Sequence, residues 1–258
     1  MTDCNPVSTP METGLKLCKR IGNASPSETN EFQKLIGCLE YAANATRPDI
    51  TYAVHRLAQF SSNPDTTHFS AAKRILRYLK GSLDFGLIFR GNKNDSFKLF
   101  GYSDADWAGN SNDRKSIGGY CFYLDNSLIS HMSKKQKTVA LSTAESETHA
   151  AVQATKEAIW LRNILKELSI KQLQPTVINC DNQAAIALSR NPEFHSRSKH
   201  VDIQYHFLRQ HVDMKTVDLE YIGSEDMAAD GLTKALSRCK HNRFCEFMQG
   251  KGIMVDNK

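Results

Sequence analysis

The spacing of apolar residues changes once along this chain, near Asp84, and the change restricts the folds that the chain can adopt. Between residues 31 and 80, apolar side chains recur about every 3.6 residues in three stripes. Pro48 and Pro64 separate one stripe from the next. From Asp84 the spacing becomes that of strands, and beyond residue 140 strands and helices alternate. Three packed helices, followed by a mixed sheet with helices on its faces, are therefore expected.

Prolines and turn residues set the expected boundaries. The first helix should run from Glu31 to about Thr46, the second contains the stripe 50–60, and the third opens at Asp65 or Thr66. Strands are expected over 85–89, 97–102, 116–124, 128–132, 176–180 and 217–222, and helices over 142–168, 182–189, 201–214 and a C-terminal region. Residues 1–30 are rich in Pro, Ser, Thr, Gly and Asn and predict an extended arm with little core.

The third expected helix carries a basic strip opposite its apolar face, formed by Lys73, Arg74, Arg77 and Lys80. Charge runs of this kind are usually solvated helix faces. The same spacing also suits the phosphates of a nucleic-acid backbone. Both interpretations remain open from the residues alone.

Four carboxylates occupy positions where expected elements begin or end. Asp104 and Asp181 follow strands, Glu147 lies in the first turns of the helix that Ser142 opens, and Asp230 precedes the terminal helical region. Each acid alone has a structural explanation, as a turn former, a helix cap or a solvated residue. Together they could converge at one edge of a sheet, where carboxylate oxygens suit Mg²⁺. Two such ions about 3.5–4 Å apart can clamp the attacking and leaving oxygens of a phosphodiester.

Composition and the N-terminus exclude other classes of protein. The 258 residues carry a formal charge of +5 and are 40% hydrophobic, which is typical of an ordinary globular chain. The N-terminus has no apolar run, so no signal peptide is expected, and no stretch approaches the roughly 20 apolar residues of a membrane span. Seven scattered cysteines indicate free thiols in a reducing compartment. A cytoplasmic or nuclear protein without membrane contact is therefore predicted.

Several motifs resemble the ribonuclease H domain of copia-type retrotransposon Pol polyproteins, in the order that the family has them. They lie at residues 101–109 (GYSDADWAG), 114–120, 133–136 (SKKQ), 142–147 (STAESE), 156–162, 180–182 (CDN), 199–203 and 229–234 (ADGLTK). The first hundred residues are similar to the thumb and connection of the element's reverse transcriptase, through residues 5–11, 46–50 and 71–81.

The resemblance implies an α/β fold in which a ribonuclease H-like mixed five-stranded sheet, flanked by helices, follows a small helical thumb-like segment. It also implies a division into a thumb and connection segment (1–95), a ribonuclease H-like domain (96–236) and a C-terminal helical tail (237–258). With this fold, the basic strip of the third helix (Lys73, Arg74, Arg77 and Lys80) becomes an expected nucleic-acid contact.

The implied activity is Mg²⁺-dependent endonucleolytic hydrolysis of the RNA strand of an RNA–DNA hybrid. Two Mg²⁺ ions, or Mn²⁺ in their place, would be held by the catalytic acids Asp104, Glu147, Asp181 and Asp230, with Asp104 bridging the ions. The expected partners are the hybrid and the palm and fingers of the same element's reverse transcriptase. The family's polymerase motif is Tyr-Val-Asp-Asp, and this sequence has no Asp-Asp pair, so no polymerase activity is expected.

Glu145 competes with Glu147 for the role of metal ligand. Ser142 and Glu145 have the spacing of a capping box, which gives Glu145 a structural role. Glu147 precedes residues 148–151, which resemble the stretch after the catalytic glutamate of ribonucleases H, so Glu147 is preferred. Asp106 is an auxiliary candidate because alternate residues of a strand share a face.

Two alternatives to an active enzyme remain from the sequence. One is a non-catalytic remnant that binds nucleic acid, because a detached ribonuclease H domain often needs its polymerase partner to position the substrate. The other is an inert fossil of a truncated element. Intact acids at all four positions favour retained or recently lost activity over long decay.

Overall fold

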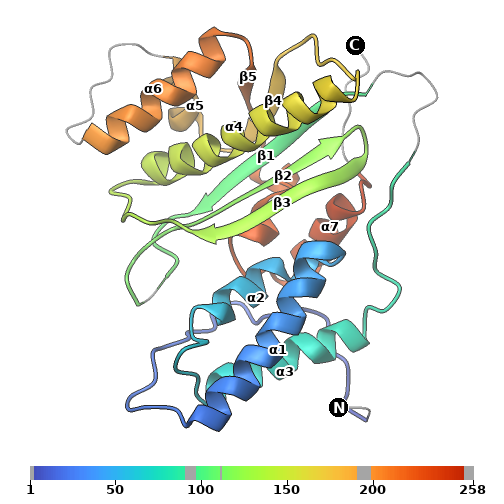
Figure 1. The fold of residues 1–258 in the computed structure, drawn as a ribbon, viewed down its shortest axis with the longest axis vertical. Coiled ribbons are helices and arrows are strands. Elements are labelled where there is room, and N and C mark those ends of the chain that lie inside the picture. The colour runs from blue at the N-terminus through green and yellow to red at the C-terminus, as the bar shows by residue number, and fades with distance from the viewer. Residues whose placement is uncertain (1–2, 91–96, 111, 191–198, 253–258) are drawn as a thin grey trace.

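A computed structural model describes residues 3–90, 97–110, 112–190 and 199–252 of the chain (Figure 1). Its helices are α1 (Pro26–Ala45), α2 (Thr51–Ala58), α3 (Thr66–Lys80), α4 (Thr143–Glu167), α5 (Gln183–Arg190), α6 (Lys199–Asp213) and α7 (Arg238–Met248). Its strands are β1 (Leu99–Asp106), β2 (Ile117–Leu124), β3 (Ser127–Lys135), β4 (Thr176–Cys180) and β5 (Val217–Tyr221). Short 3₁₀ turns are η1 (Pro48–Ile50), η2 (Ser224–Asp226) and η3 (Asp230–Leu232). No described helix is both long enough and apolar enough to cross a membrane.

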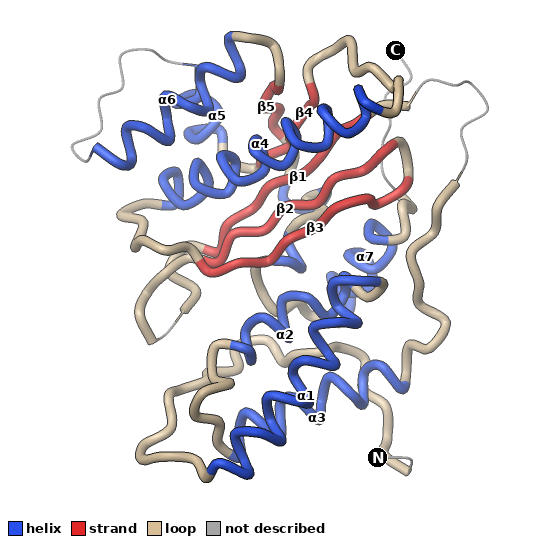
Figure 2. Tube along the Cα trace, in the orientation of Figure 1, coloured by secondary structure: helices blue, strands red, loops and turns tan. Residues whose placement is uncertain are grey.

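Within the described residues the strands form one mixed sheet in the order β3-β2-β1-β4-β5. β1, β2 and β3 pair antiparallel, whereas β1 with β4 and β4 with β5 pair parallel. Figure 2 shows α4 lying across one face of this sheet, with α5 and α6 beside it. The mixed five-stranded sheet flanked by helices that the sequence predicts is confirmed.

Both faces of the central strands are covered, because apolar side chains alternate between two cores. Tyr120 and Phe122 of β2 pack with α4. Cys121 and Tyr123 of the same strand pack on the opposite side, in a core that includes Phe244 of α7. The period of two along a strand produces this division. β1 and β2 are thereby held rigidly at the centre of the molecule.

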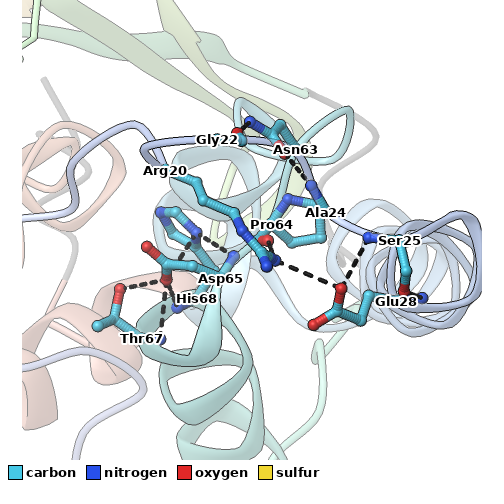
Figure 3. Close-up of polar contacts among 10 residues, drawn as sticks. All are labelled: Arg20, Gly22, Ala24, Ser25, Glu28, Asn63, Pro64, Asp65, Thr67 and His68. Carbon is cyan, nitrogen blue, oxygen red and sulfur yellow. Dashed lines mark hydrogen bonds and ion pairs between the residues drawn. The ribbon is translucent and has the colours of Figure 1, made fainter.

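The three N-terminal helices have their own core, and their capping residues fix where they begin. Ser25 and Glu28 form a capping box at the start of α1, and Asp65 accepts hydrogen bonds from the first turn of α3 (Figure 3). The helix expected from Glu31 therefore begins five residues earlier, at Pro26, because Ser25 already satisfies the free backbone N–H groups there.

Two other sequence expectations are wrong. Leu17 and Met11 are buried among the N-terminal helices, so the first 30 residues do contribute core. Residues 85–89 form no strand, because Phe85 and Leu87 pack against the core beneath the sheet instead of pairing with a strand. The domain boundary predicted between residues 95 and 96 touches residues outside the described ranges, and the predicted division stays a prediction.

A buried polar network joins α7 to the helical part. The Tyr78 hydroxyl donates to Asp49 Oδ2 at 2.6 Å, and His241 Nε2 lies 2.9 Å from the Tyr78 oxygen. Arg47 donates to both carboxylate oxygens of Asp49, from Nε at 3.0 Å and from Nη2 at 2.8 Å. Asp49, His241 and Cys245 have ligand atoms close enough for a metal ion. The guanidinium and the phenol already satisfy Asp49, however, so we interpret this group as structural.

Candidate active site

Neighbouring parallel strands bring two of the predicted acids to the same edge of the sheet. Tyr102 of β1 is in register with Asn179 of β4, so Asp104 is level with Asp181, which directly follows β4. β1 extends to Asp106, so Asp104 lies within the strand and not after it, as the sequence had indicated. Glu147 is added from the first turns of α4, which packs on β1 (Figure 1).

Asp104, Glu147 and Asp181 form a compact carboxylate cluster. One carboxylate oxygen of each lies within 4.8 Å of the others. Asp104 and Glu147 are only 3% and 5% exposed. Burial, followed by repulsion from neighbouring carboxylates, raises the pKa of Asp104 to about 7 and that of Glu147 to about 9. Without a cation, the cluster therefore retains protons near neutral pH.

Asp230 lies beside this cluster, in η3, and not at the start of the terminal helix. The pKa of its carboxyl is raised by burial and by Asp181, and Lys234 opposes the rise. Lys234 Nζ is 2.7 Å from Asp230 Oδ1. Asp104 and Asp230 raise the pKa of this lysine although burial alone would lower it. Asp230 is outside the group of three but interacts electrostatically with it.

Hydrogen bonds orient the three clustered carboxylates. Thr233 Oγ1 donates to Asp104 Oδ2. The backbone N–H of residue 105 donates to Glu147 Oε1 at 3.3 Å, and Ser224 Oγ donates to Asp181 Oδ2 at 2.9 Å. Sequence reasoning missed the roles of Thr233 and Lys234, although Lys234 lies four residues after Asp230, a spacing that pairs side chains over one helical turn.

The two glutamates occupy different environments. Glu145 Oε2 accepts a hydrogen bond from the Leu141 N–H at 2.8 Å, and the N–H of Glu145 donates to Ser142 Oγ at 3.1 Å. Ser142 therefore caps α4, and Glu145 binds the N–H of Leu141 instead of the Ser142 N–H that a complete capping box would use, whereas Glu147 joins the clustered acids. The auxiliary candidate Asp106 lies outside the compact group of three.

A glycine in β2 allows η3 to approach the acids. Gly119 is in register with Asp104. A Cβ atom built at Gly119 would lie 2.7 Å from the Cβ of Leu232 in η3, a separation that real Cβ atoms do not adopt. The neighbouring Gly118 has its nearest contact at 3.5 Å, which is ordinary van der Waals distance. Gly119 is therefore required for the close packing that holds Asp230 beside Asp104.

The donor set of the cluster fits a hard divalent cation. Carboxylate oxygens from three elements converge in a buried position, and oxygen ligands suit Mg²⁺ or Mn²⁺. Burial is the first cause of the raised pKa values and repulsion between the carboxylates the next, and a bound cation would offset both. Asp104, Glu147 and Asp181 are the residues that would hold the ion, with Asp230 adjacent.

In the structure, three side chains of the basic strip on α3 bind other residues of the same chain. Arg74 Nη1 pairs with Glu12 at 2.6 Å. Arg77 Nε donates to the carbonyl of residue 5 at 2.7 Å, and Lys80 Nζ donates to the carbonyl of residue 4 at 2.8 Å. These three side chains hold the N-terminal segment on α3. The nucleic-acid contact predicted for them and for Lys73 stays a prediction.

Comparison with known proteins identifies close relatives. No family model matches the chain. It is 42% identical over 244 residues to the retrovirus-related Pol polyprotein from transposon RE2 of Arabidopsis thaliana, covering 95% of this chain and 16% of that polyprotein. It is also 42% identical over 245 residues to the Pol polyprotein from transposon TNT 1-94 of Nicotiana tabacum, covering 93% and 18%. A foamy viral protease-reverse transcriptase structure aligns with TM-score 0.49 and 13% identity, over 76% of this chain and 25% of that one.

Proposed function

Because the chain belongs to the family of retrovirus-related Pol polyproteins of copia-type transposons, we propose that it cleaves the RNA strand of RNA–DNA hybrids in a divalent-metal-dependent reaction. It spans less than a fifth of the length of the polyproteins that it matches. In this proposal it forms their ribonuclease H part, with the helical thumb and connection segment in residues 1–95, the ribonuclease H domain in 96–236 and the helical tail in 237–258. The reverse transcriptase palm and fingers of the same element are the proposed protein partner.

One observation carries the proposal, namely the convergence of Asp104, Glu147 and Asp181 from three separate elements. Isolated buried carboxylates are costly because they lose hydration, and three together also repel one another. A chain that only needed stability would gain by replacing them. Their presence together in one buried position favours a site that holds cations during function.

The chain's own groups prepare this site for hydrolysis of a phosphodiester. Thr233 and the N–H of residue 105 fix the carboxylates of Asp104 and Glu147, so these side chains need no reorganisation when the substrate arrives. Two divalent ions, when bound, would supply the charge that activates water and stabilises the leaving 3′ oxygen. Lys234, beside Asp230, places a positive charge at the border of the cluster. We propose that it attracts the substrate phosphate there.

The alternative functions remain a non-catalytic nucleic-acid-binding remnant and an inert fossil. The buried acidic cluster favours the enzyme over a remnant that only binds nucleic acid, because three buried carboxylates cost stability and binding alone does not require them. The cleavage assay distinguishes the enzyme from an inert fossil.

The proposal is tested by incubating the chain with labelled RNA–DNA hybrid, RNA duplex and DNA duplex, each with Mg²⁺, with Mn²⁺ and with a chelator. We expect cleavage of the hybrid's RNA strand alone, and only with metal. The Asp104→Asn variant keeps the shape of the side chain but loses its charge, and it should be inactive. Equal cleavage by wild type and variant, or no cleavage by the wild type, would reject the proposal.

A further inference from the structure

Asp106 is a further acid at the edge of the sheet that holds the cluster, and the proposed reaction does not use it. It lies two residues after Asp104 on β1, and alternate residues of a strand face the same side. A carboxylate in this position can compete with the proposed ligands for a divalent ion. Among the described residues, the group of acids around Asp104 nevertheless contains Glu147 and Asp181 but not Asp106. The fold therefore separates Asp106 from the cluster.

The side chain of Asp106 lies over the loop that follows β1. A Cβ atom built at Gly109 would collide with Asp106 Oδ2, so the carboxylate rests against the backbone of this glycine. The N–H of Gly109 donates to the carbonyl of residue 106 at 3.4 Å. Gly109 therefore leaves the space that the Asp106 carboxylate occupies.

Arg56 of α2 brings a buried positive charge to this carboxylate. Arg56 is 5% exposed, and among the described residues its Nη1 atom has no hydrogen-bond partner. Burial raises the pKa of Asp106, and the charges of Lys234 and then Arg56 oppose the rise. Burial also raises the pKa of Tyr52, one turn before Arg56, which Arg56 lowers and Asp106 raises further. Arg56, Tyr52 and Asp106 are therefore neighbours.

Hydrogen bonds and packing fix α2 beside the end of β1. Asn110 is 1% exposed, and its Nδ2 donates at 3.0 Å to Oε1 of Gln59, which directly follows α2. α2 also contacts η3, the turn that begins at Asp230. The helical segment is thereby attached both to the loop that follows Asp106 and to the turn beside the acids.

Lys234 is shared among several carboxylates. Its Nζ atom is 2.7 Å from Asp230 Oδ1. Burial lowers the pKa of Lys234, whereas Asp104, Asp230 and Asp106 raise it. One ammonium group thus faces three carboxylates. Without Arg56, the uncompensated charge of Asp106 would attract either Lys234 or a divalent ion, since a buried charge that loses its partner is costly.

We propose that Arg56 is a positioning residue of the nuclease site. It neutralises Asp106, so that Lys234 stays at Asp230 and divalent ions bind at the cluster and not at Asp106. Arg56 acts through Asp106 and contacts neither the substrate nor an ion. The proposal rests on the proposed function, and it makes α2 of the helical segment a part of the nuclease site.

The test removes Arg56 and then the charge that it compensates. Arg56→Gln leaves Asp106 uncompensated, the double variant Arg56→Gln/Asp106→Asn removes both charges, and Arg56→Lys keeps the positive charge. The matched control is Arg20→Gln, which removes a guanidinium of the same segment that pairs with Glu28 at 3.5 Å. Calorimetric titration with Mn²⁺ in the absence of hybrid gives the number of bound ions. Hybrid cleavage with Mg²⁺ gives kcat and KM, and circular dichroism confirms folding.

Arg56→Gln should bind about one Mn²⁺ more than wild type, because a free carboxylate is added beside Asp104. Its kcat should fall by about ten- to a hundredfold with little change in KM, since small displacements at a reacting centre have effects of this size. Asp106→Asn in the double variant should reverse both changes, a coupling that only interacting residues show. Arg56→Lys and Arg20→Gln should stay close to wild type.

Unchanged Mn²⁺ binding by Arg56→Gln, changes that the double variant does not reverse, or equal changes in Arg20→Gln would overturn the proposal. If Arg56→Gln fails to fold, the double variant should fold again, and a double variant that stays unfolded would also overturn it. If wild type does not cleave hybrid, but Arg56→Gln gains a Mn²⁺ ion that the double variant loses, the role of Arg56 is supported and the proposed activity is rejected.

Discussion

Replacing Glu147 by Gln should stabilise the metal-free chain while abolishing cleavage. The folded protein raises the pKa of Glu147 to about 9, first through burial and then through Asp104 and Asp181. The pKa in the unfolded chain is about 4.3. Because the folded state then binds more protons, the contribution of this group to stability is complete below about pH 4.3 and is lost as the pH rises toward 9.

The structure sets the size of this effect. Between pH 4.3 and pH 8, one carboxyl with a raised pKa can cost up to about 5 kcal/mol, at about 1.4 kcal/mol per pH unit. Asp104 lies within 4.8 Å and competes for the same proton, so removing one charge recovers only part of the cost. We expect the Gln variant to gain about 2–4 kcal/mol at pH 8, or roughly 5–15 °C in Tm, and nearly nothing at pH 4.

The matched control is Glu145→Gln, two residues away on the same helix. It weakens a hydrogen bond at the start of α4 and should cost up to about 1 kcal/mol, with cleavage retained. Thermal melts followed by circular dichroism in a chelator, at pH 4 and pH 8, give the stabilities, and hybrid cleavage with Mg²⁺ gives the activities. A Glu147→Gln variant that melts below wild type at pH 8, or that still cleaves, would refute the reasoning.

Three further predictions concern the frame around the site. Gly119→Ala should push Leu232 away, lower the free energy of unfolding by about 1–3 kcal/mol and slow cleavage, whereas Gly118→Ala should be tolerated. Similar melting temperatures and cleavage rates for the two variants would contradict this. Burial lowers the pKa of His241 to about 4, so the folding stability that this group contributes above about pH 6.5 should be lost as the pH falls toward 4. His241→Gln should therefore show a smaller fall of melting temperature between about pH 6.5 and pH 4. An equal fall in wild type and variant would argue against this. Arg77→Ala should speed amide hydrogen exchange in residues 4–12, and unchanged exchange would show that the contact does not hold the segment.

The order of elements and three clustered acids could be predicted from the sequence because they depend on local patterns. Alternation along β2 indicates two buried faces, and the positions of Asp104 and Asp181 near strand ends predicted that they could converge at one edge of the sheet. The parallel pairing of β1 with β4, which brings them together, was not predicted. The spacing of Ser142 and Glu145 indicated a structural role for Glu145, and in the structure Glu145 lies at the start of α4 whereas only Glu147 joins the cluster. The role of Glu147 as a metal ligand stays a prediction.

The features that the sequence did not predict depend on contacts between distant residues. The basic strip on α3 looked free, but Glu12 and the backbone of residues 4 and 5 reach it over more than 60 residues of chain. The apolar run 85–89 has the residue spacing of a strand, yet Phe85 packs against the core between the sheet and α7 and pairs with no strand. The need for Gly119 appears only once Leu232 lies against it.

The chemical ends of the cleaved RNA test the central claim most directly. Water that attacks the phosphorus while the 3′ oxygen leaves produces a 5′-phosphate and a 3′-hydroxyl, and mass spectrometry of the fragments identifies both. We predict these ends for wild type with Mg²⁺, and no product from Asp104→Asn or in a chelator. Fragments ending in 2′,3′-cyclic phosphate, or the same fragments from wild type and Asp104→Asn, would contradict a metal-dependent site built on Asp104, Glu147 and Asp181.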